Sequence, residues 1–245
     1  MAAKRKAKKP ADSRARRILR RVLRWTGIVV VASVALSVLA VLPLRWIDPP
    51  TTSFMLRDGS GSGREPLLHE WVDWAALGTA MPLAVVASED QRFAEHFGFD
   101  VGQIRKSIDT AQQGGRLRGA STITQQLVKN LYLSSSRSLV RKGLEAWLTL
   151  VAESCLPKRR ILEIYVNVAE LGPGIYGVGA AGRYYFGKTA AGLSDADAAL
   201  LAATLPSPLR LRADSPTPYL RERQAWILGQ MQRLRREDWL RRLDD

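Results

Sequence analysis

One stretch of the chain, residues 25–44, runs for 20 residues without a charged side chain and is rich in Val, Leu, Ile and Ala. As an α-helix it is roughly 30 Å long, which matches the hydrocarbon thickness of a bilayer. Trp25 and Trp46 lie at its ends, where membrane helices often place aromatic side chains. The run therefore predicts a transmembrane helix, and the rest of the fold must lie on either side of it.

The basic side chains are concentrated before this run. Residues 1–24 hold 11 Lys or Arg against one Asp, and they account for most of the formal net charge of +14. Because positively charged flanks stay in the cytoplasm, we expect a cytoplasmic tail at 1–24, a single-pass helix, and an extracytoplasmic remainder. A cleaved signal peptide is the alternative, but its apolar core usually spans only about 7–15 residues. A buried core helix would leave the abrupt basic flank unexplained.

After the apolar run, the sequence predicts a linker at 45–63 and one mostly α-helical domain at 64–245. Residues 51–56 could form a short strand, and 58–63 are typical of a flexible loop. Helices are expected at 83–93, 101–112, 122–131, 138–156, 158–171, 195–205 and 219–240, with Pro82 as the first residue of the first of these. The lone Cys155 rules out an intrachain disulfide, and two histidines make a His-based zinc site improbable.

The first polar cluster begins at Glu89 and Asp90, directly after a run of apolar and small residues. Carboxylates on helices are usually solvated surface groups. On a continuous helix, however, Phe93 and His96 would share the face of Glu89, and a carboxylate beside aromatic rings in a partly dry cleft can act as a base. For His96 we expect the ordinary role of a helix-end side chain bonded to a carbonyl.

The second cluster, Ser121-Thr122-Ile123-Thr124-Gln125-Gln126, gathers hydroxyl and amide groups where a helix begins. Thr122 and Gln125 have the spacing of a capping box, which is the structural alternative. A helix N-terminus also favours anions, so the cluster could line a phosphate site extended by Lys129 and Asn130.

The third cluster places Arg137, Arg141 and Glu145 four residues apart, with Lys142 beside them. By spacing alone, the preferred interpretation is a solvent-exposed ladder of ion pairs worth about 0.3–0.5 kcal/mol each. The functional alternative is a cationic clamp for a pyrophosphate, in which Glu145 orients a cation or holds a divalent metal such as Mg²⁺ or Mn²⁺.

Taken together and in order, these clusters resemble the peptidoglycan glycosyltransferases of glycosyltransferase family 51, in particular the monofunctional biosynthetic members. The likeness covers roughly residues 50–225. Five motifs carry it: Glu89-Asp90-x-x-Phe93-x-x-His96-x-Gly98, Gly119-x-Ser121-Thr122-Ile123-Thr124-Gln125-Gln126 with Lys129-Asn130, Arg141-Lys142-x-x-Glu145, Lys158-x-x-Ile161-Leu162-Glu163-x-Tyr165-x-Asn167, and Gly177-x-Gly179-Ala180-Ala181-x-x-Tyr184-Tyr185-Phe186-Gly187.

The resemblance implies a mainly α, lysozyme-like, bilobal domain in the bacterial inner membrane that polymerises lipid II into glycan strands for cell wall biogenesis. Glu89 would be the general base and Glu145 a supporting catalytic carboxylate. Glu163 and Asn167 would hold the fold together. Substrate binding would fall to Ser121, Thr122, Gln125, Gln126, Lys129, Asn130, Arg137, Arg141 and Lys142.

The resemblance implies no organic cofactor. The expected partners are lipid II, the nascent strand, the membrane and other cell-wall synthesis proteins. Three other functions are weighed against this one. A lysozyme-like hydrolase or lytic enzyme would also use one carboxylate, but it has no need of a cationic clamp. A non-catalytic scaffold would not need the polar residues. Nucleic-acid binding would require basic residues across the domain, whereas the basic excess lies in the tail.

Overall fold

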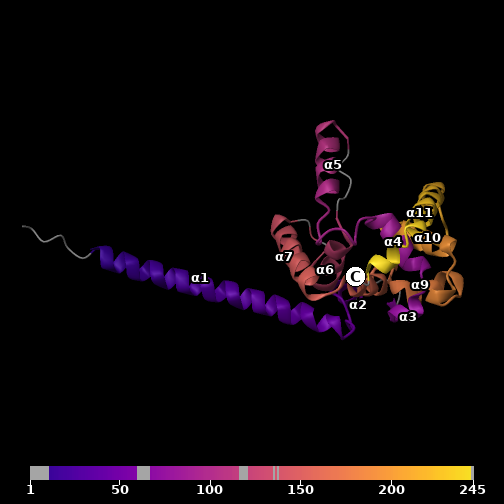
Figure 1. Ribbon diagram of the computed structural model, residues 1–245. Helices are drawn as coiled ribbons and strands as arrows, with labels where there is room; N and C mark the ends of the chain where they lie inside the picture. Colours follow the sequence, from indigo (N-terminus) through magenta and orange to yellow (C-terminus); the bar gives the residue numbers. More distant parts are fainter. Residues whose placement is uncertain (1–10, 60–66, 116–120, 135, 137, 244–245) are drawn as a thin grey trace, which may run out of the picture.

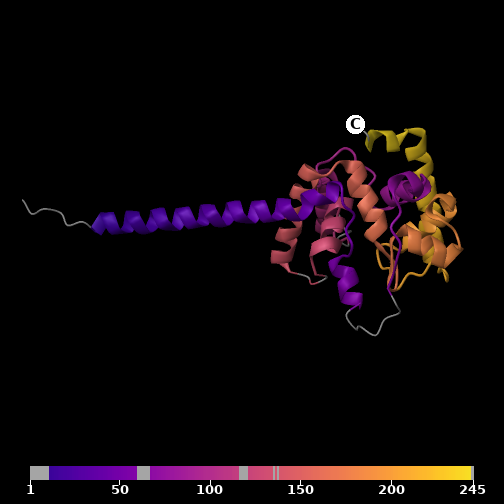
Figure 2. The same cartoon turned by 90° about the horizontal axis from the view of Figure 1, so that it is seen from below.

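The structure is a computed structural model that describes residues 11–59, 67–115, 121–134, 136 and 138–243. Within these ranges the chain is mostly helical, as predicted. The longest element, α1 (Ala11–Val41), extends from the body as a rod and ends in the 3₁₀ helix η1 (Leu42–Arg45) (Figures 1 and 2). A span from Arg16 to Arg45 is long and apolar enough to cross a membrane. Only 11% of its apolar window is buried, which excludes the core-helix alternative.

The core has two groups of helices joined by α8 (Lys158–Val168). On one side, α6 (Ile123–Tyr132) packs against α7 (Leu139–Cys155), which also contacts α1. On the other side, α4 (Ala80–Glu89) packs against α10 (Asp195–Thr204) and α11 (Pro218–Arg236) (Figure 1). The central helix α8 contacts both α6 and α4. Functional side chains carried by α4 and α6 are thereby fixed on a shared, buried support.

The composition of α4 explains its central place. Its residues from Ala80 to Ala87 are all buried, so the helix is apolar around its whole circumference, as expected of a core helix. Three further helices complete this side: α3 (Trp74–Leu77), α9 (Gly177–Phe186) and the 3₁₀ helix η2 (Ala190–Gly192). The 3₁₀ helix η3 (Trp239–Leu243), which follows α11 in the chain, buries Trp239 against Phe93, with ring centroids 6.4 Å apart.

The described residues include one small sheet, in the order β1 (Leu68–His69), β3 (Ile175–Tyr176), β2 (Glu170–Gly172). Its central strand β3 is parallel to β1 and antiparallel to β2. The helix predicted at 158–171 therefore ends at Val168. At Gly177 the backbone has φ +78°, and a Cβ there would lie 2.3 Å from the Asn167 carbonyl oxygen. Only glycine fits where α9 approaches the end of α8.

Other sequence-based boundaries are corrected by the structure. The strand expected at 51–56 is wrong: Ser53–Gly59 form helix α2, because the Thr52 hydroxyl accepts a hydrogen bond from the Met55 N–H and so caps that helix. Helix α4 starts at Ala80, so Pro82 is its third residue. It also ends at Glu89 and not at residue 93. Most of the loop expected at 58–63 lies outside the described residues.

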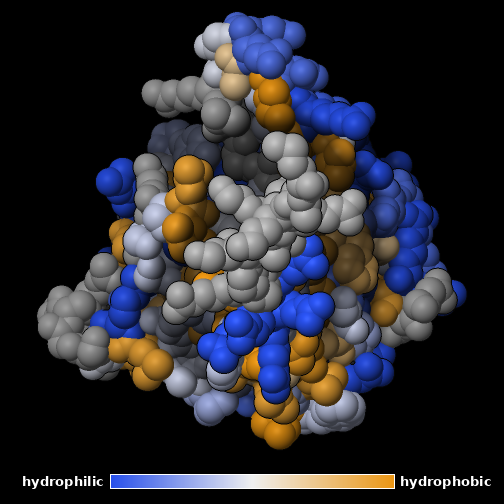
Figure 3. Space-filling model, turned by 90° about the vertical axis from the view of Figure 1, so that its left-hand side faces the viewer, coloured by the Kyte–Doolittle hydropathy of each residue, from blue (hydrophilic) through white to orange (hydrophobic). Residues whose placement is uncertain are grey.

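Two further expected helices are confirmed. The helix expected at 195–205 is α10, which opens with a capping box formed by Ser194 and Asp197. The helix expected at 101–112 is α5 (Val101–Gln112), which begins at the Asp100 cap and projects from the body (Figure 1). In the space-filling view of the α1 end of the molecule, this upper projection carries hydrophobic as well as hydrophilic side chains (Figure 3). Val101 and Ile108 are among its exposed apolar residues.

Candidate active site

Glu89 is the last residue of α4, and its carboxylate meets groups from two other helices. Gln126 of α6 donates from its side-chain amide to one carboxylate oxygen at 2.9 Å. Arg223 of α11 donates to the other oxygen at 3.1 Å. The chain stops being helical here because Asp90 adopts φ −162° and ψ 75°. Glu89 therefore lies at the junction of the two helical groups.

Burial sets the proton affinity of Glu89. Its side chain is only 13% exposed. Removal from water raises the pKa of Glu89, while the Gln126 hydrogen bond and the charges of Arg223 and Lys129 act in the opposite direction. The net result is a carboxyl group with a raised pKa and few water contacts. Such a group can accept a proton from an alcohol near neutral pH.

The amide of Gln126 is oriented by a second partner. The buried Tyr165 of α8 donates its hydroxyl proton to the Gln126 side-chain oxygen at 2.8 Å. This contact turns the amide nitrogen toward Glu89. Burial and the nearby carboxylates Glu89 and Asp90 raise the pKa of Tyr165 well above its ordinary value, so the phenol remains a donor.

Asp90 and His96 form a neighbouring contact with a structural function. The Asp90 carboxylate accepts the Ile123 N–H at 3.1 Å, which ties the start of α6 to the end of α4. Its other oxygen lies 2.8 Å from Nε2 of His96. The expected carbonyl partner of His96 is therefore wrong. Because α4 ends at Glu89, the prediction that Phe93 and His96 share its helical face is wrong as well.

The polar residues at the start of α6 divide into two kinds. Thr122 and Gln125 are buried and form the predicted capping box, and Thr122 also donates to the Gly98 carbonyl at 2.7 Å. These hydrogen bonds engage the side chains of Thr122 and Gln125 with other groups of the protein. Ser121 and Gln126 are only partly buried and remain near the surface of the site. The prediction that all four line a donor site stays a prediction, with Ser121 and Gln126 the better placed.

Glu145, on α7, is surrounded by cations. Arg141 donates to one carboxylate oxygen at 2.6 Å, and Lys142 bonds the other. The Glu145 side chain is only 3% exposed. A solvent-exposed ladder is therefore wrong, because the carboxylate is buried beneath its partners. Arg137, the third predicted cation of this face, lies outside the described residues.

Lys129 of α6 interacts electrostatically with both carboxylates. Burial lowers the pKa of Lys129, and the positive charges of Arg141 and Lys142 lower it further. The negative charges of Glu145 and Glu89 act to raise it. The Lys129 ammonium group thus interacts with both Glu89 and Glu145. The neighbouring Asn130 has a structural contact, since its backbone oxygen accepts a bond from the Ser53 hydroxyl at 3.1 Å.

The surroundings of Glu145 do not match a metal site. Both of its oxygens bond to cationic side chains. Among the described residues, no group of three or more His, Cys, Asp or Glu side chains is placed to hold a metal ion. The donor set around Glu145 therefore suits an anion that approaches its cations.

Two neighbours of Glu89 received no role from sequence. Arg223 follows Glu89 by 134 residues, in a helix predicted only from its amphipathic pattern. Tyr165 belonged to a motif, but nothing in its spacing indicated a contact with Gln126. The structural role expected of Glu163 and Asn167 is confirmed: Asn167 bonds both the N–H and the C=O of Val72, and Glu163 accepts the Trp74 N–H.

A largely buried carboxylate and a cluster of cations, linked electrostatically by Lys129 in a helical domain, suit the displacement of an anionic leaving group. Comparison with known proteins agrees with this class. The transglycosylase family model matches residues 61–232. A biosynthetic peptidoglycan transglycosylase of Pseudomonas aeruginosa is 49% identical over 214 residues, which cover 86% of this chain and 92% of the relative.

Two further relatives carry the same name. That of Xanthomonas campestris pv. campestris strain B100 is 49% identical over 230 residues, covering 91% of this chain and 94% of the relative. That of Shewanella oneidensis is 44% identical over 218 residues, covering 88% and 94%. The chain belongs to the transglycosylase family and is a glycosyltransferase, which confirms the family predicted from its motifs.

Proposed function

We propose that this enzyme polymerises lipid II into the glycan strands of peptidoglycan. The observation that carries the proposal is the pairing of Glu89, a buried base, with the cations around Glu145, joined by Lys129. The names of the relatives identify peptidoglycan as the polymer. The site supplies the two groups that the transfer requires, a proton acceptor and a counter-charge for pyrophosphate.

In the proposed step, Glu89 removes the proton from the 4-hydroxyl of the acceptor GlcNAc. The hydroxyl oxygen attacks C1 of the donor MurNAc and forms the new glycosidic bond. The bond from C1 to the lipid pyrophosphate breaks, and the electron pair leaves with that group. The configuration at C1 changes from α to β. Gln126 and Tyr165 hold the carboxylate in position for this transfer.

Charge builds up on the pyrophosphate as its bond to C1 breaks. Lys129, Arg141 and Lys142 are the described cations that would offset it, with Arg137 as a fourth on the resemblance. Glu145 holds Arg141 and Lys142 in place before the substrate binds. The pKa of Lys129, which burial lowers, would rise beside a dianion, and this favours the charged form of the group.

A hydrolase that cleaves the same polymer is the competing function. It must protonate a glycosidic oxygen with a carboxylic acid, whereas pyrophosphate leaves without that help. Labelled lipid II and gel separation distinguish the two, because synthesis gives a ladder of lengthening products. Glu89→Gln should abolish the ladder in a chain that still folds. A ladder of normal intensity from that variant would contradict the assignment of the base.

We also propose that α1 spans the inner membrane with residues 1–24 in the cytoplasm and the domain in the periplasm. The basic tail and the length and apolar character of α1 support this orientation. Deletion of residues 1–44 should weaken polymerisation of membrane-embedded lipid II more than it lowers the stability of the domain. Equal activity with and without the anchor would contradict it. Other cell-wall synthesis proteins remain expected partners.

A further inference from the structure

Helix α11 lies at the opposite end of the molecule from the membrane-spanning helix α1 (Figures 1 and 2). Four of its residues are buried in the core: Leu220, Ile227, Met231 and Leu234. One flank of α11 is tied to α10, because Gln224 donates to the Ala196 carbonyl at 2.7 Å and Arg235 pairs with Asp195 at 2.6 Å. The other flank of α11 is exposed to solvent.

This exposed flank begins at the active site. Arg223, whose guanidinium bonds Glu89 at 3.1 Å, lies where the buried side of α11 meets its solvent side. Residues three, four or seven positions apart share one side of a helix. From Arg223 this side continues through Trp226, Gln230 and Arg233, and Tyr219 lies one turn before it. We call Tyr219, Trp226, Gln230 and Arg233 the α11 stripe; from Arg223 to Arg233 it extends about 15 Å along the helix.

The side chains of the α11 stripe are open to a ligand. Tyr219 and Trp226 are 57% and 49% exposed. A Cβ built at Gly229, three residues after Trp226, would meet nothing within 4 Å, so no neighbouring side chain covers the surface there. Within the described part of the chain, no hydrogen bond or ion pair engages the side chains of Gln230 and Arg233.

These groups match the chemistry of a sugar polymer with acidic substituents. The face of an aromatic ring packs against the C–H groups of a sugar, and an amide bonds sugar hydroxyls. A guanidinium group pairs with a carboxylate in a charge-assisted hydrogen bond. Because α11 lies at the far end of the molecule from α1, its exposed aromatic rings are poorly placed to contact the bilayer.

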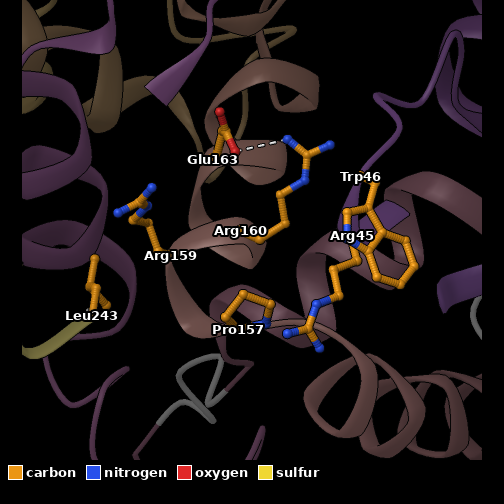
Figure 4. Close-up of a pocket in the computed structure, with 7 residues that line it drawn as sticks. All are labelled: Arg45, Trp46, Pro157, Arg159, Arg160, Glu163 and Leu243. Carbon is orange, nitrogen blue, oxygen red and sulfur yellow. Dashed lines mark hydrogen bonds and ion pairs between the residues drawn. The ribbon is translucent and has the colours of Figure 1, made fainter. Parts of the chain in front are cut away.

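The pocket between η1 and α8 does not offer such a surface (Figure 4). Its Arg160 already pairs with Glu163 at 2.8 Å and with Asp48 at 2.7 Å. Arg45, which also lines it, is the last residue of the span that could cross the membrane. A polymer that grows away from the bilayer would not pass this pocket.

We infer that the α11 stripe binds the nascent glycan strand as it leaves the active site. The inference rests on the proposed function, and it assigns that site a binding surface beyond the reacting sugars. Glu89 contacts Gln126 of α6 on one side and Arg223 of α11 on the other. A strand whose lipid pyrophosphate is held by the cations of α6 and α7 would therefore continue past Glu89 toward α11.

On this surface, Trp226 packs against a sugar ring, and Arg233 pairs with the carboxylate that ends a stem peptide. Gln230 bonds sugar hydroxyls between them. The stripe would hold the strand while the next lipid II molecule enters. Its expected effect is a larger number of transfers before the strand is released.

The first test measures binding of short, uncrosslinked glycan strands to the full chain in a non-ionic detergent by surface plasmon resonance. Strands are used with their stem peptides and after removal of the peptides. Trp226→Ala should weaken binding of both preparations, whereas Arg233→Gln should weaken only that of the peptide-bearing strands. Together they should lower the affinity for peptide-bearing strands about tenfold, since an aromatic contact and a surface ion pair are each worth a factor of about three.

The matched control is Leu209→Ala/Arg210→Gln in the loop between α10 and α11. It removes an exposed apolar side chain, 45% exposed at Leu209, and one exposed positive charge outside the stripe. This variant should bind both strand preparations as the unmodified chain does. Thermal unfolding should be unchanged in both double variants because the altered side chains are exposed.

The second test follows polymerisation of labelled lipid II by Trp226→Ala/Arg233→Gln. The coupling of two lipid II molecules should proceed at the normal rate, because so short a product does not reach the stripe. The ladder of longer products should shift to lengths at least twofold shorter than those of the control. Equal strand binding and equal ladder lengths in the two double variants would overturn the inference, as would equal losses of the first coupling and of the long products.

Failure of the proposed function is recognised separately. If the unmodified chain forms no polymer from lipid II, the proposed function is contradicted. Strand binding is measured without turnover, so it reports on the stripe whatever the outcome with lipid II. A normal ladder from the unmodified chain, with no difference between the double variant and the control, would overturn the inference alone.

Discussion

The contact between Arg223 and Glu89 allows a quantitative test of how the base is tuned. Replacing Arg223 with glutamine removes the positive charge 3.1 Å from the carboxylate but keeps a polar side chain. The remaining influences on Glu89 are burial and the charge of Asp90, which raise its pKa, and the Gln126 hydrogen bond and the charge of Lys129, which lower it. Loss of the arginine should therefore raise the pKa of Glu89 further.

The size of the effect follows from the geometry. A hydrogen bond to a charged group contributes about 1.5–3 kcal/mol. Because the Arg223 side chain is 22% exposed, solvent screens part of this, and we take about 1–2 kcal/mol. At about 1.4 kcal/mol for each factor of ten, the ionised form of Glu89 becomes about 5- to 30-fold less populated wherever the group is partly protonated.

The direction of this shift in the pKa of Glu89 determines which part of the pH profile should change. A base works only when ionised, so activity falls as pH decreases through the pKa of Glu89. Arg223→Gln should move this acid limb of the kcat profile to higher pH and leave the plateau at high pH nearly unchanged. Arg223→Lys keeps the charge and should shift the limb less. An unmoved acid limb, or a loss of equal size at every pH, would refute a tuning role for Arg223.

Three other results are expected. Glu145→Gln removes a buried carboxylate that bonds Arg141 and Lys142, whose side chains are 18% and 47% exposed, so the free energy of unfolding in urea should fall by about 1–2 kcal/mol. Glu222→Gln on an exposed face should change it by less than about 0.5 kcal/mol. Asn167→Ala leaves the N–H and C=O of Val72 without their hydrogen-bond partner and should lower the free energy of unfolding by about 3 kcal/mol or more in the same assay. A chelator should reduce polymerisation less than twofold, because cationic side chains carry the proposed charge compensation; a larger loss would restore the metal hypothesis for Glu145.

Much of the architecture follows from local sequence. An unbroken apolar run is typical of a membrane span, a signal peptide or a core helix, and its length of 20 residues together with its basic flank favours the span. Capping residues such as Ser194 and Thr122 mark helix starts because their side chains bond to free N–H groups nearby. These signals depend on neighbours within a few residues. The motif order adds the family, so Glu89 and Glu145 can be named before any coordinate is known.

What the tertiary structure decided is the surroundings of those carboxylates. From spacing alone, Glu145 belongs on a solvated ladder, whereas in the structure it is buried on α7, which packs against α6. Arg223 reaches Glu89 because α11 packs on α4, a contact between segments 134 residues apart that no local pattern records. Burial and long-range charge determine the proton affinity of the base, and both are properties of the packed molecule.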